Sequence, residues 1–244
     1  EAICEMAPQI TQVSQERILM ELERLLTAPA RVEGVRLLRQ SGLWQIILPE
    51  LEPKDDRQEQ QWRTNLQILN HLNEPGFPLA FAAMARGFVE LSKVKSLCRR
   101  LRMANDQGDR IHFLLEHEKS LDEAEKKKWS EIQPLLISPY VEDLLKLVEA
   151  RARTENRDCP SVPWCRERLK WPKEQLNPPP LIRGDDLLET GIVQGPMFKE
   201  ILEQIRKAQL DGAVTSREEA LQLGIEMARK LCSQNNVANR DKRE

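Results

Sequence analysis

The side chains with the widest chemical range in this sequence are three histidines, five cysteines and two pairs of adjacent aspartates. His112 and His117 are five residues apart, so a helix would place them on different faces, whereas two metal ligands on one helix face are typically about four apart. Asp185 and Asp186 fall at an expected helix start, where the helix dipole favours acids without any metal ion. The sequence has no glycine-rich phosphate loop and no Gly-x-Ser-x-Gly motif. These patterns indicate neither a catalytic centre nor a metal site.

The cysteines and the hydropathy pattern bear on the compartment in which the protein works. Cys159 and Cys165 are the closest pair, and no second pair or nearby histidine completes a zinc site. We therefore expect reduced thiols in a cytoplasmic protein. No apolar run approaches the roughly 18 residues of a membrane span, and no signal-peptide pattern is present. Because residue 1 is Glu rather than Met, we also expect the sequence to be part of a longer chain.

The segment RGFVELSKVKSLCRRLR, residues 86–102, is strongly basic. On a helix, Lys95, Arg99 and Arg102 follow an i, i+4, i+7 pattern and form one stripe. The opposite, apolar face is predicted to consist of Val94, Leu97, Cys98 and Leu101. Little of the charge is neutralised within the segment, so the stripe is a candidate for contact with an anionic partner; the alternative is an ordinary solvated helix face. The whole chain has a formal net charge of −2, so any nucleic-acid contact must come from local patches of this kind.

A second basic cluster, WCRERLKWPK, occupies residues 164–173. It includes Arg166, Lys170 and Lys173, interleaved with two tryptophans. Basic groups beside indole rings suit phosphate contact combined with base stacking. The alternative is that both tryptophans pack this segment onto the neighbouring helices, and the two uses are compatible.

A third candidate is the pair Gly195-Pro196, which predicts a helix start. The unpaired N–H groups and the dipole of such a start favour an anion, Gly195 allows a phosphate to approach closely, and Lys199 lies one turn away. Against this, Lys199 can pair with Glu203, and Glu203 with Lys207, at i, i+4 spacing.

The apolar residues recur with helical spacing almost everywhere, and the composition is rich in Leu, Glu, Lys, Arg and Gln, so we predict an all-α protein. Beyond the first 50 residues, the pattern predicts helices over residues 57–73, 78–86, 89–103, 106–118, 121–132, 138–153, 164–175, 185–190, 196–210 and 216–234. We expect three small helical subdomains in an elongated array, over residues 1–55, 56–155 and 156–244. Ser14 is predicted to cap an early helix, Ser138 to start the helix at 138–153, and Thr215 with Glu218 to form a capping box at the last one.

At this point the sequence resembles a known family. The segment PPPLIRGDDLLETGIVQGPMFKEILEQIRKAQLDGAVTSREEALQL, residues 178–223, closely resembles the tail of the tRNA nucleotidyltransferase/poly(A) polymerase family, and in particular of the bacterial-type CCA-adding enzymes. The phrases VSQERILMELERLL, residues 13–26, and LLRQSGLWQIILPEL, residues 37–51, are similar to the neck of that family. The resemblance covers nearly the whole chain.

The resemblance implies a role in tRNA binding. In this family a catalytic head precedes the neck and carries the metal-binding aspartates, and no match to those motifs is found here. The chain would therefore be the neck, body and tail, holding the acceptor stem and elbow of tRNA through phosphate contacts and shape, without adding nucleotides by itself. No cofactor is expected in this chain, and Mg²⁺ is expected in the missing head.

Many relatives carry a His-Asp phosphohydrolase domain where the body lies. Here Thr64 stands in place of a metal-binding histidine, and Arg86 and Gly87 stand in place of the His-Asp pair, so the resemblance implies a degenerate body without hydrolase activity. Two rival functions remain open at this stage. In the first, the parent protein would be a poly(A) polymerase. In the second, the chain would be a free-standing helical module that binds protein.

Overall fold

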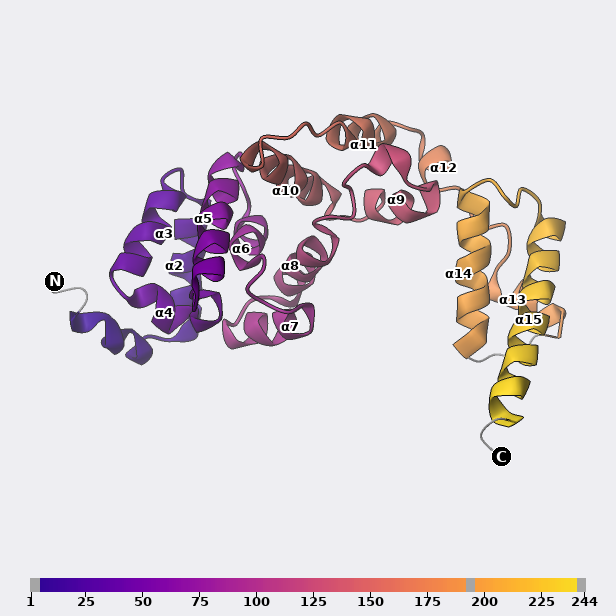
Figure 1. Cartoon of the computed structure of the whole chain (residues 1–244), viewed down its shortest axis with the longest axis horizontal. Coiled ribbons are helices and arrows are strands. Elements are labelled where there is room, and N and C mark those ends of the chain that lie inside the picture. Colours follow the sequence, from indigo (N-terminus) through magenta and orange to yellow (C-terminus); the bar gives the residue numbers. More distant parts are fainter. Residues whose placement is uncertain (1–4, 192–195, 241–244) are drawn as a thin grey trace. The chain divides into compact units, whose positions relative to one another are not determined.

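The computed structural model describes residues 5–191 and 196–240, and the side chains of residues 5–191 and 197–230. Every regular element in these residues is helical, which confirms the all-α prediction (Figure 1). The chain divides into two compact units. Unit 1 comprises Glu1–Ala124 and Pro139–Trp164, and unit 2 comprises Glu125–Ser138 and Cys165–Glu244. The predicted subdomain limits after residues 55 and 155 both lie inside unit 1 and remain predictions.

Unit 1 is a bundle of short helices. In chain order these are η1 (Ala7–Gln12), α2 (Gln15–Thr27), α3 (Arg31–Gln40), α4 (Leu43–Ile47), η2 (Pro49–Leu51), α5 (Asp56–His71), α6 (Phe77–Ala85), α7 (Leu91–Arg100), α8 (Asn105–His117) and α10 (Val141–Thr154). Its centre is α6, whose sequence FPLAFAAMA is apolar on all sides and is almost entirely buried. A helix of that kind needs neighbours on every face, and α6 packs against α2, α5, α8 and α10.

Helix ends in unit 1 are fixed by side chains. Ser14 caps α2 as predicted, accepting a hydrogen bond from the Arg17 backbone N–H. Asp55 caps α5 in the same way, through the Gln58 N–H at 2.7 Å. At the far end of α5, the buried guanidinium of Arg31 donates to the carbonyl oxygen of Leu69 at 3.0 Å and also to that of Leu72. These bonds satisfy carbonyl groups that the last turn of a helix leaves unpaired.

Unit 2 holds a smaller core. Its helices are α9 (Trp129–Leu136), α12 (Lys173–Leu176), α13 (Gly184–Glu189), α14 (Pro196–Leu210) and α15 (Arg217–Arg240). The core residues are Ile182, Leu187, Ile201, Ile205, Val214 and Ala220. Gly224 of α15 faces this core so closely that a Cβ atom there would lie 2.8 Å from the Cδ2 of Leu187, so α15 can approach α13 only at a glycine.

Two short segments, η3 (Ala124–Lys126) and α11 (Ser161–Leu169), lie where the chain passes between the units. The predicted helix over 121–132 is wrong, because Glu123 has a φ of +53°, and only η3 forms before α9 begins at Trp129. The predicted helix over 164–175 is divided into α11 and α12, because Pro172 disfavours helical backbone at the residue before it.

Two predicted helix starts are displaced. The helix placed at residue 138 begins at Val141, with Tyr140 at its N-cap. The capping box of α15 uses Ser216 and Glu219 rather than Thr215 and Glu218: the Ser216 hydroxyl accepts from the Glu219 N–H at 3.2 Å, and the Glu219 carboxylate accepts from the Ser216 N–H at 3.3 Å. The same carboxylate also accepts from the backbone N–H of Thr215 at 2.7 Å.

Candidate nucleic-acid interface

The basic stripe predicted on residues 86–102 is partly formed. Lys95 and Arg99 lie one turn apart on α7 and line a pocket of 410 Å³. The Nζ of Lys95 is 2.9 Å from a carboxylate oxygen of Asp109, whereas Arg99 has no carboxylate within 4 Å in the described part of unit 1. The predicted apolar face is confirmed, since its four members are all buried. Arg99 is therefore the cation of this stripe whose charge is least compensated.

Arg102 does not continue the stripe. Helix α7 ends at Arg100, and Arg102 has a φ of +58°. Its N–H donates to the Arg99 carbonyl at 3.1 Å, and the N–H of Met103 donates to the Cys98 carbonyl at 2.9 Å. This is the Schellman pattern, in which the residue after the helix takes a left-handed conformation. The side chain of Arg102 is exposed and lies 3.7 Å from Glu16, so it remains accessible to an anion from another direction.

The neighbouring Arg100 has a structural role. Its guanidinium makes two hydrogen bonds to the carboxylate of Glu50, at 2.9 and 2.7 Å, and a third to the carbonyl of Ile47 at 3.1 Å. These bonds connect α7 to α4 and η2. A basic residue in this segment is therefore not by itself a candidate for RNA contact.

The second basic cluster is exposed, and one of its tryptophans is packed. Arg166 and Lys170 extend from α11 and its end, and Lys173 begins α12; all three are exposed. Lys170 lies 2.6 Å from the carboxylate of Glu167. The ring of Trp171 packs against that of Trp129 in α9, with centroids 5.4 Å apart. This contact within unit 2 matches the packing interpretation of Trp171.

Of the two residues predicted for an anion site at the start of α14, only Lys199 lies in the described part of the chain. Lys199 is 85% exposed, and its Nζ is 3.8 Å from the carboxylate of Glu203. The second pair considered for this helix, Glu203 with Lys207, is not within 4 Å in the described structure. Gly195 lies outside the described residues. The prediction of an anion site at the start of α14 therefore remains a prediction.

One basic pocket was not predicted from the sequence. Arg36 and Arg39 of α3 and Arg63 of α5 line a pocket of 570 Å³ together with Trp62. The Arg39 guanidinium lies 4.4 Å from the centroid of the Trp62 ring, but it also pairs with Glu52 and Glu59 at 3.1 and 2.7 Å. The hydrogen bond from Arg39 holds the pKa of Glu59 below its usual value. In the sequence, the only indication of this pocket was the i, i+3 spacing of Arg36 and Arg39, which places them on one face of α3.

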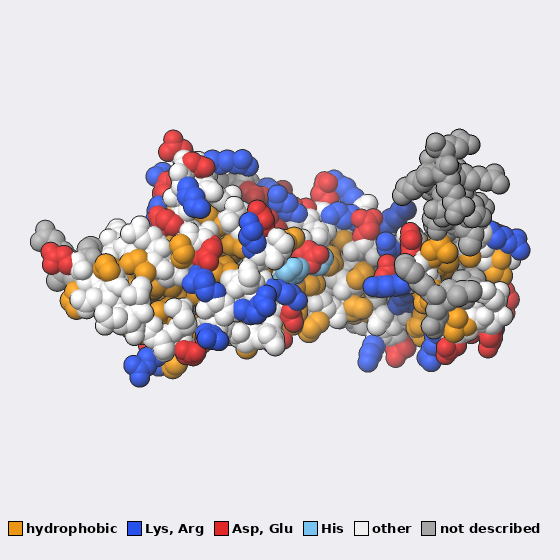
Figure 2. Space-filling model, turned by 90° about the horizontal axis from the view of Figure 1, so that it is seen from below, with side chains coloured by type: hydrophobic (Ala, Val, Ile, Leu, Met, Phe, Trp, Pro, Cys, Tyr) orange, Lys and Arg blue, Asp and Glu red, His pale blue; other side chains and the backbone are white. Residues whose placement is uncertain are grey.

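On the face drawn in Figure 2, lysine and arginine side chains are interspersed with aspartates and glutamates. No continuous basic band is visible on that face. Contact with a polyanion would therefore rest on separate cations, of which Arg99 and Lys173 have no carboxylate partner among the described residues.

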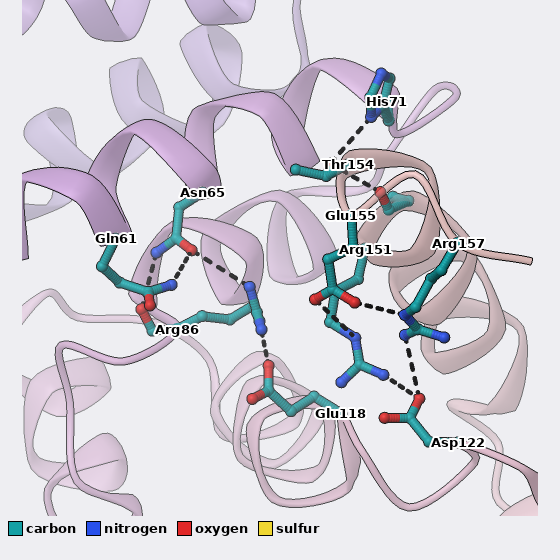
Figure 3. Close-up of polar contacts among 11 residues, drawn as sticks. Gln61, Asn65, His71, Arg86, Glu118, Asp122, Arg151, Thr154, Glu155 and Arg157 are labelled. Atoms are coloured by element: carbon teal, nitrogen blue, oxygen red, sulfur yellow. Dashed lines mark hydrogen bonds and ion pairs between the residues drawn. The ribbon is translucent and has the colours of Figure 1, made fainter.

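The interior of unit 1 contains a polar network at the position of the implied His-Asp site (Figure 3). The Arg86 guanidinium pairs with the Glu118 carboxylate and lies 3.4 Å from the side-chain oxygen of Asn65. Asn65 in turn donates to the carbonyl oxygens of Met84 and Arg86, at 2.9 and 2.8 Å. The described residues contain no group of three His, Cys, Asp or Glu side chains that could hold a metal ion.

A neighbouring cluster in Figure 3 is also built from ion pairs. Arg151 is 2% exposed and pairs with Asp122, which also receives Arg157 at 3.4 Å. Both arginines reach Glu155 as well. These contacts connect the loop after α8 to the end of α10, so their role is to hold unit 1 together.

Three further observations concern the remaining sequence predictions. Cys98, Cys159 and Cys165 form no disulfide bond, and burial raises the pKa of the Cys98 thiol to about 11. His71 contacts the hydroxyl of Thr154 at 3.0 Å rather than another candidate ligand. Among the described helices, none combines the length and apolar character that crossing a membrane requires.

Comparison with known proteins gives two matches. Residues 1–55 match a family model described as the probable RNA and SrmB-binding site of polymerase A. Over 226 residues, the chain is 25% identical to a CCA-adding enzyme of Geobacillus sp. (strain WCH70), an alignment that covers 91% of this chain and 52% of that protein. The chain thus spans about half the length of this curated relative.

Proposed function

Because the chain belongs to the C-terminal region of the CCA-adding enzyme and poly(A) polymerase family, we propose that it is the tRNA-binding portion of a CCA-adding enzyme. The observation that carries this proposal is the match of residues 1–55 to an RNA-binding family model, within a longer alignment to a CCA-adding enzyme. The protein would work in the cytoplasm, where its substrate is found.

The charge distribution supports recognition of RNA by its outline. The side chains of an RNA-binding protein cannot read the deep, narrow groove of an A-form helix, so contacts fall on phosphates and riboses. Exposed cations on both units, among them Arg99 and Lys173, suit such contacts while the whole chain stays near neutrality. In this proposal the acceptor stem and elbow of tRNA are held by these separate cations.

We assign the body of unit 1 to a degenerate His-Asp phosphohydrolase scaffold. In this assignment Arg86 would take the place of a metal-binding histidine, and its guanidinium, paired with Glu118, supports the assignment because it cannot bind a metal ion. Gly87 has a φ of +74°, and a Cβ atom there would lie 3.0 Å from the Cγ of Gln61, so an aspartate at this position would be strained. Thr64 is half-buried and donates its hydroxyl hydrogen to the Gln60 carbonyl at 3.0 Å. Elemental analysis of the purified chain tests this assignment, and stoichiometric zinc, iron or manganese would contradict it.

We assign nucleotide addition, and the Mg²⁺ that it needs, to a catalytic head outside this chain. The described carboxylates do not gather into a group that fits a divalent ion. Incubated with CTP, ATP, Mg²⁺ and tRNA lacking its 3′ end, the chain should leave the tRNA unextended. Extension by the chain alone would contradict this part of the proposal.

Fluorescence anisotropy at low salt separates the proposed function from its two rivals. Labelled tRNA and labelled oligoadenylate are each titrated with the chain. A CCA-adding parent predicts clearly tighter binding of tRNA, whereas a poly(A) polymerase parent predicts tighter binding of oligoadenylate. A helical module that binds protein predicts no measurable binding of either RNA.

A further inference from the structure

Unit 2 contains a hollow of 640 Å³ between α9, the segment 177–184 and α14. Its apolar lining residues, which we call the floor, include Pro134, Ile137, Leu181 and Leu202. Ile137 is 44% exposed, so its side chain is accessible from the hollow. The hollow is large enough for a nucleotide and too apolar to be an ordinary hydrated groove.

Four cations and one acid also line the hollow. The cations are Arg183, Lys199, Arg206 and Lys207, and the acid is Glu203. Lys199 lies 3.8 Å from Glu203. The other three cations have no carboxylate within 4 Å in the described part of unit 2. Three positive charges thus line the hollow without a carboxylate in ion-pair distance, although Arg183 also interacts electrostatically with Asp186, which is paired with Arg217.

Arg206 is held in place by neutral acceptors. Its guanidinium donates to the side-chain oxygens of Gln209 and Asn177, both at 2.9 Å. Gln209 is in turn fixed by the backbone of the proline-rich segment, donating to the Pro179 carbonyl at 2.7 Å and accepting from the Leu181 N–H at 3.3 Å. Amide oxygens orient the guanidinium without cancelling its charge.

Partial burial lowers the pKa of Arg206 from its usual value, although a guanidinium stays protonated at any physiological pH. A fixed, uncompensated cation beside an apolar floor fits a ligand with an anionic end and a flat, weakly polar body. Phosphate and nucleobase supply these two parts in every nucleotide, and the unstacked bases of a folded RNA expose both.

We propose that this hollow holds one unstacked nucleotide of the bound RNA, with its base on the apolar floor and its phosphate against Arg206, Arg183 and Lys207. This inference rests on the proposed function, and it adds a defined contact of the tail with RNA. None of the residues that line the hollow is aromatic in the described structure, so the base is held by apolar contact rather than by ring stacking. The hollow should therefore show little preference among bases.

Methyl NMR of the chain labelled at isoleucine tests the contact directly. Ile137 and Ile182 line the hollow and serve as reporters. The probes are a tRNA, AMP and inorganic phosphate. We expect tRNA to shift both methyl resonances and AMP to shift them only at much higher concentration. Inorganic phosphate should leave the Ile137 methyl resonance unchanged.

The matched variants avoid Arg206, whose loss would also release Asn177 and Gln209. Arg183 and Lys207 are exposed, and their side chains make no ion pair in the described structure. We expect the Arg183→Ala/Lys207→Ala chain to lose the tRNA-induced shift at Ile137 and to bind tRNA about 10-fold more weakly, because two phosphate contacts are removed. Lys230→Ala, an exposed lysine of α15 away from the hollow, is the control and should bind as the unaltered chain does.

The outcomes separate this inference from the proposed function. In one outcome tRNA binds with strong salt dependence, but the methyl resonances of Ile137 and Ile182 do not shift and the double variant binds tRNA as tightly as Lys230→Ala does. The hollow then does not hold RNA, and only the inference fails. If AMP moves these methyl groups and tRNA does not, the inference is also overturned. If tRNA does not bind at all, the proposed function fails, and the inference fails with it.

Discussion

Asp211, just after α14, caps a helix that begins far away in the sequence. One carboxylate oxygen accepts from the backbone N–H of Ser130 at 2.8 Å, and the other accepts from the Ser130 hydroxyl, also at 2.8 Å. The N-cap residue of α9, Lys128, has no side-chain acceptor of its own. Asp211, which lies in the segment 178–223 that resembles the family's tail, therefore forms a structural contact between the end of α14 and the start of α9.

Asp211→Ala should destabilise unit 2. The change removes both hydrogen bonds to Ser130 and leaves the first turn of α9 uncapped, which costs about 1 kcal/mol. Urea unfolding at pH 7 measures the loss. Asp185→Asn is the control, because the Asp185 side chain is exposed in the same unit and makes no hydrogen bond within the described residues; an equal effect of the two changes would contradict the capping role.

Asp186 should make part of the stability depend on acid pH. The hydrogen bond from Arg217, at 2.6 Å, is the main cause that lowers the pKa of Asp186, and the Arg183 backbone N–H adds to it. Because the pKa is lower in the folded state, this contribution is present above the ordinary aspartate pKa of about 3.9 and is lost as pH falls through the folded-state value. The urea midpoints of the unaltered chain and of Asp186→Asn should differ at pH 7 and converge below about pH 4. A difference that stays constant down to pH 3 would exclude the ionised pair as its source.

Arg102→Gly should raise the stability of unit 1 and lower its affinity for RNA. A glycine relieves the left-handed backbone at φ +58°, which should stabilise unit 1 by about 1 kcal/mol, while the loss of the cation should weaken tRNA binding. Arg102→Ala removes the same charge without relieving the backbone, so it should weaken binding equally and give no gain in stability. Thermal unfolding and anisotropy on both variants make the comparison. Unchanged affinity in both would remove Arg102 from the RNA-contacting set.

Arg86→Met should be among the most destabilising single changes in unit 1. It leaves the Glu118 carboxylate, whose side chain is 18% exposed, without its partner, at a cost of about 3 kcal/mol. Adding Glu118→Gln removes the stranded charge and should recover part of the loss. Urea unfolding of the single and double variants tests this, and a double variant less stable than Arg86→Met would show that Glu118 has another essential role.

The helical periodicity predicted most elements because local apolar spacing decides whether a helix forms. Ser14 was recognised as a cap because its partner lies within the next turn. The errors occur where a local pattern is overridden. Glu123 adopts a left-handed backbone that the sequence does not signal, and the Schellman turn at Arg102 ends α7 before the third position of the predicted stripe.

The hollow around Arg206 was not predicted for a different reason. It depends on contacts between α9, the proline-rich segment and α14, and residues so far apart in sequence leave no periodic signal. Arg206 itself was not singled out, and Lys207 was considered only as a possible helical ion-pair partner of Glu203, a pair that the described residues do not form. The role of Asp211 was hidden in the same way, since Ser130 lies 81 residues away.

The salt dependence of tRNA affinity tests the central claim most directly. If separate cations hold RNA phosphates, the logarithm of the association constant should fall steeply with the logarithm of salt concentration, and Arg99→Ala or Lys173→Ala should each make the slope shallower by about 1. Arg153→Ala, an exposed arginine of α10 paired with Glu149, should leave the slope unchanged. A slope near zero, or no measurable tRNA binding at low salt, would contradict the claim that this chain is an RNA-binding region.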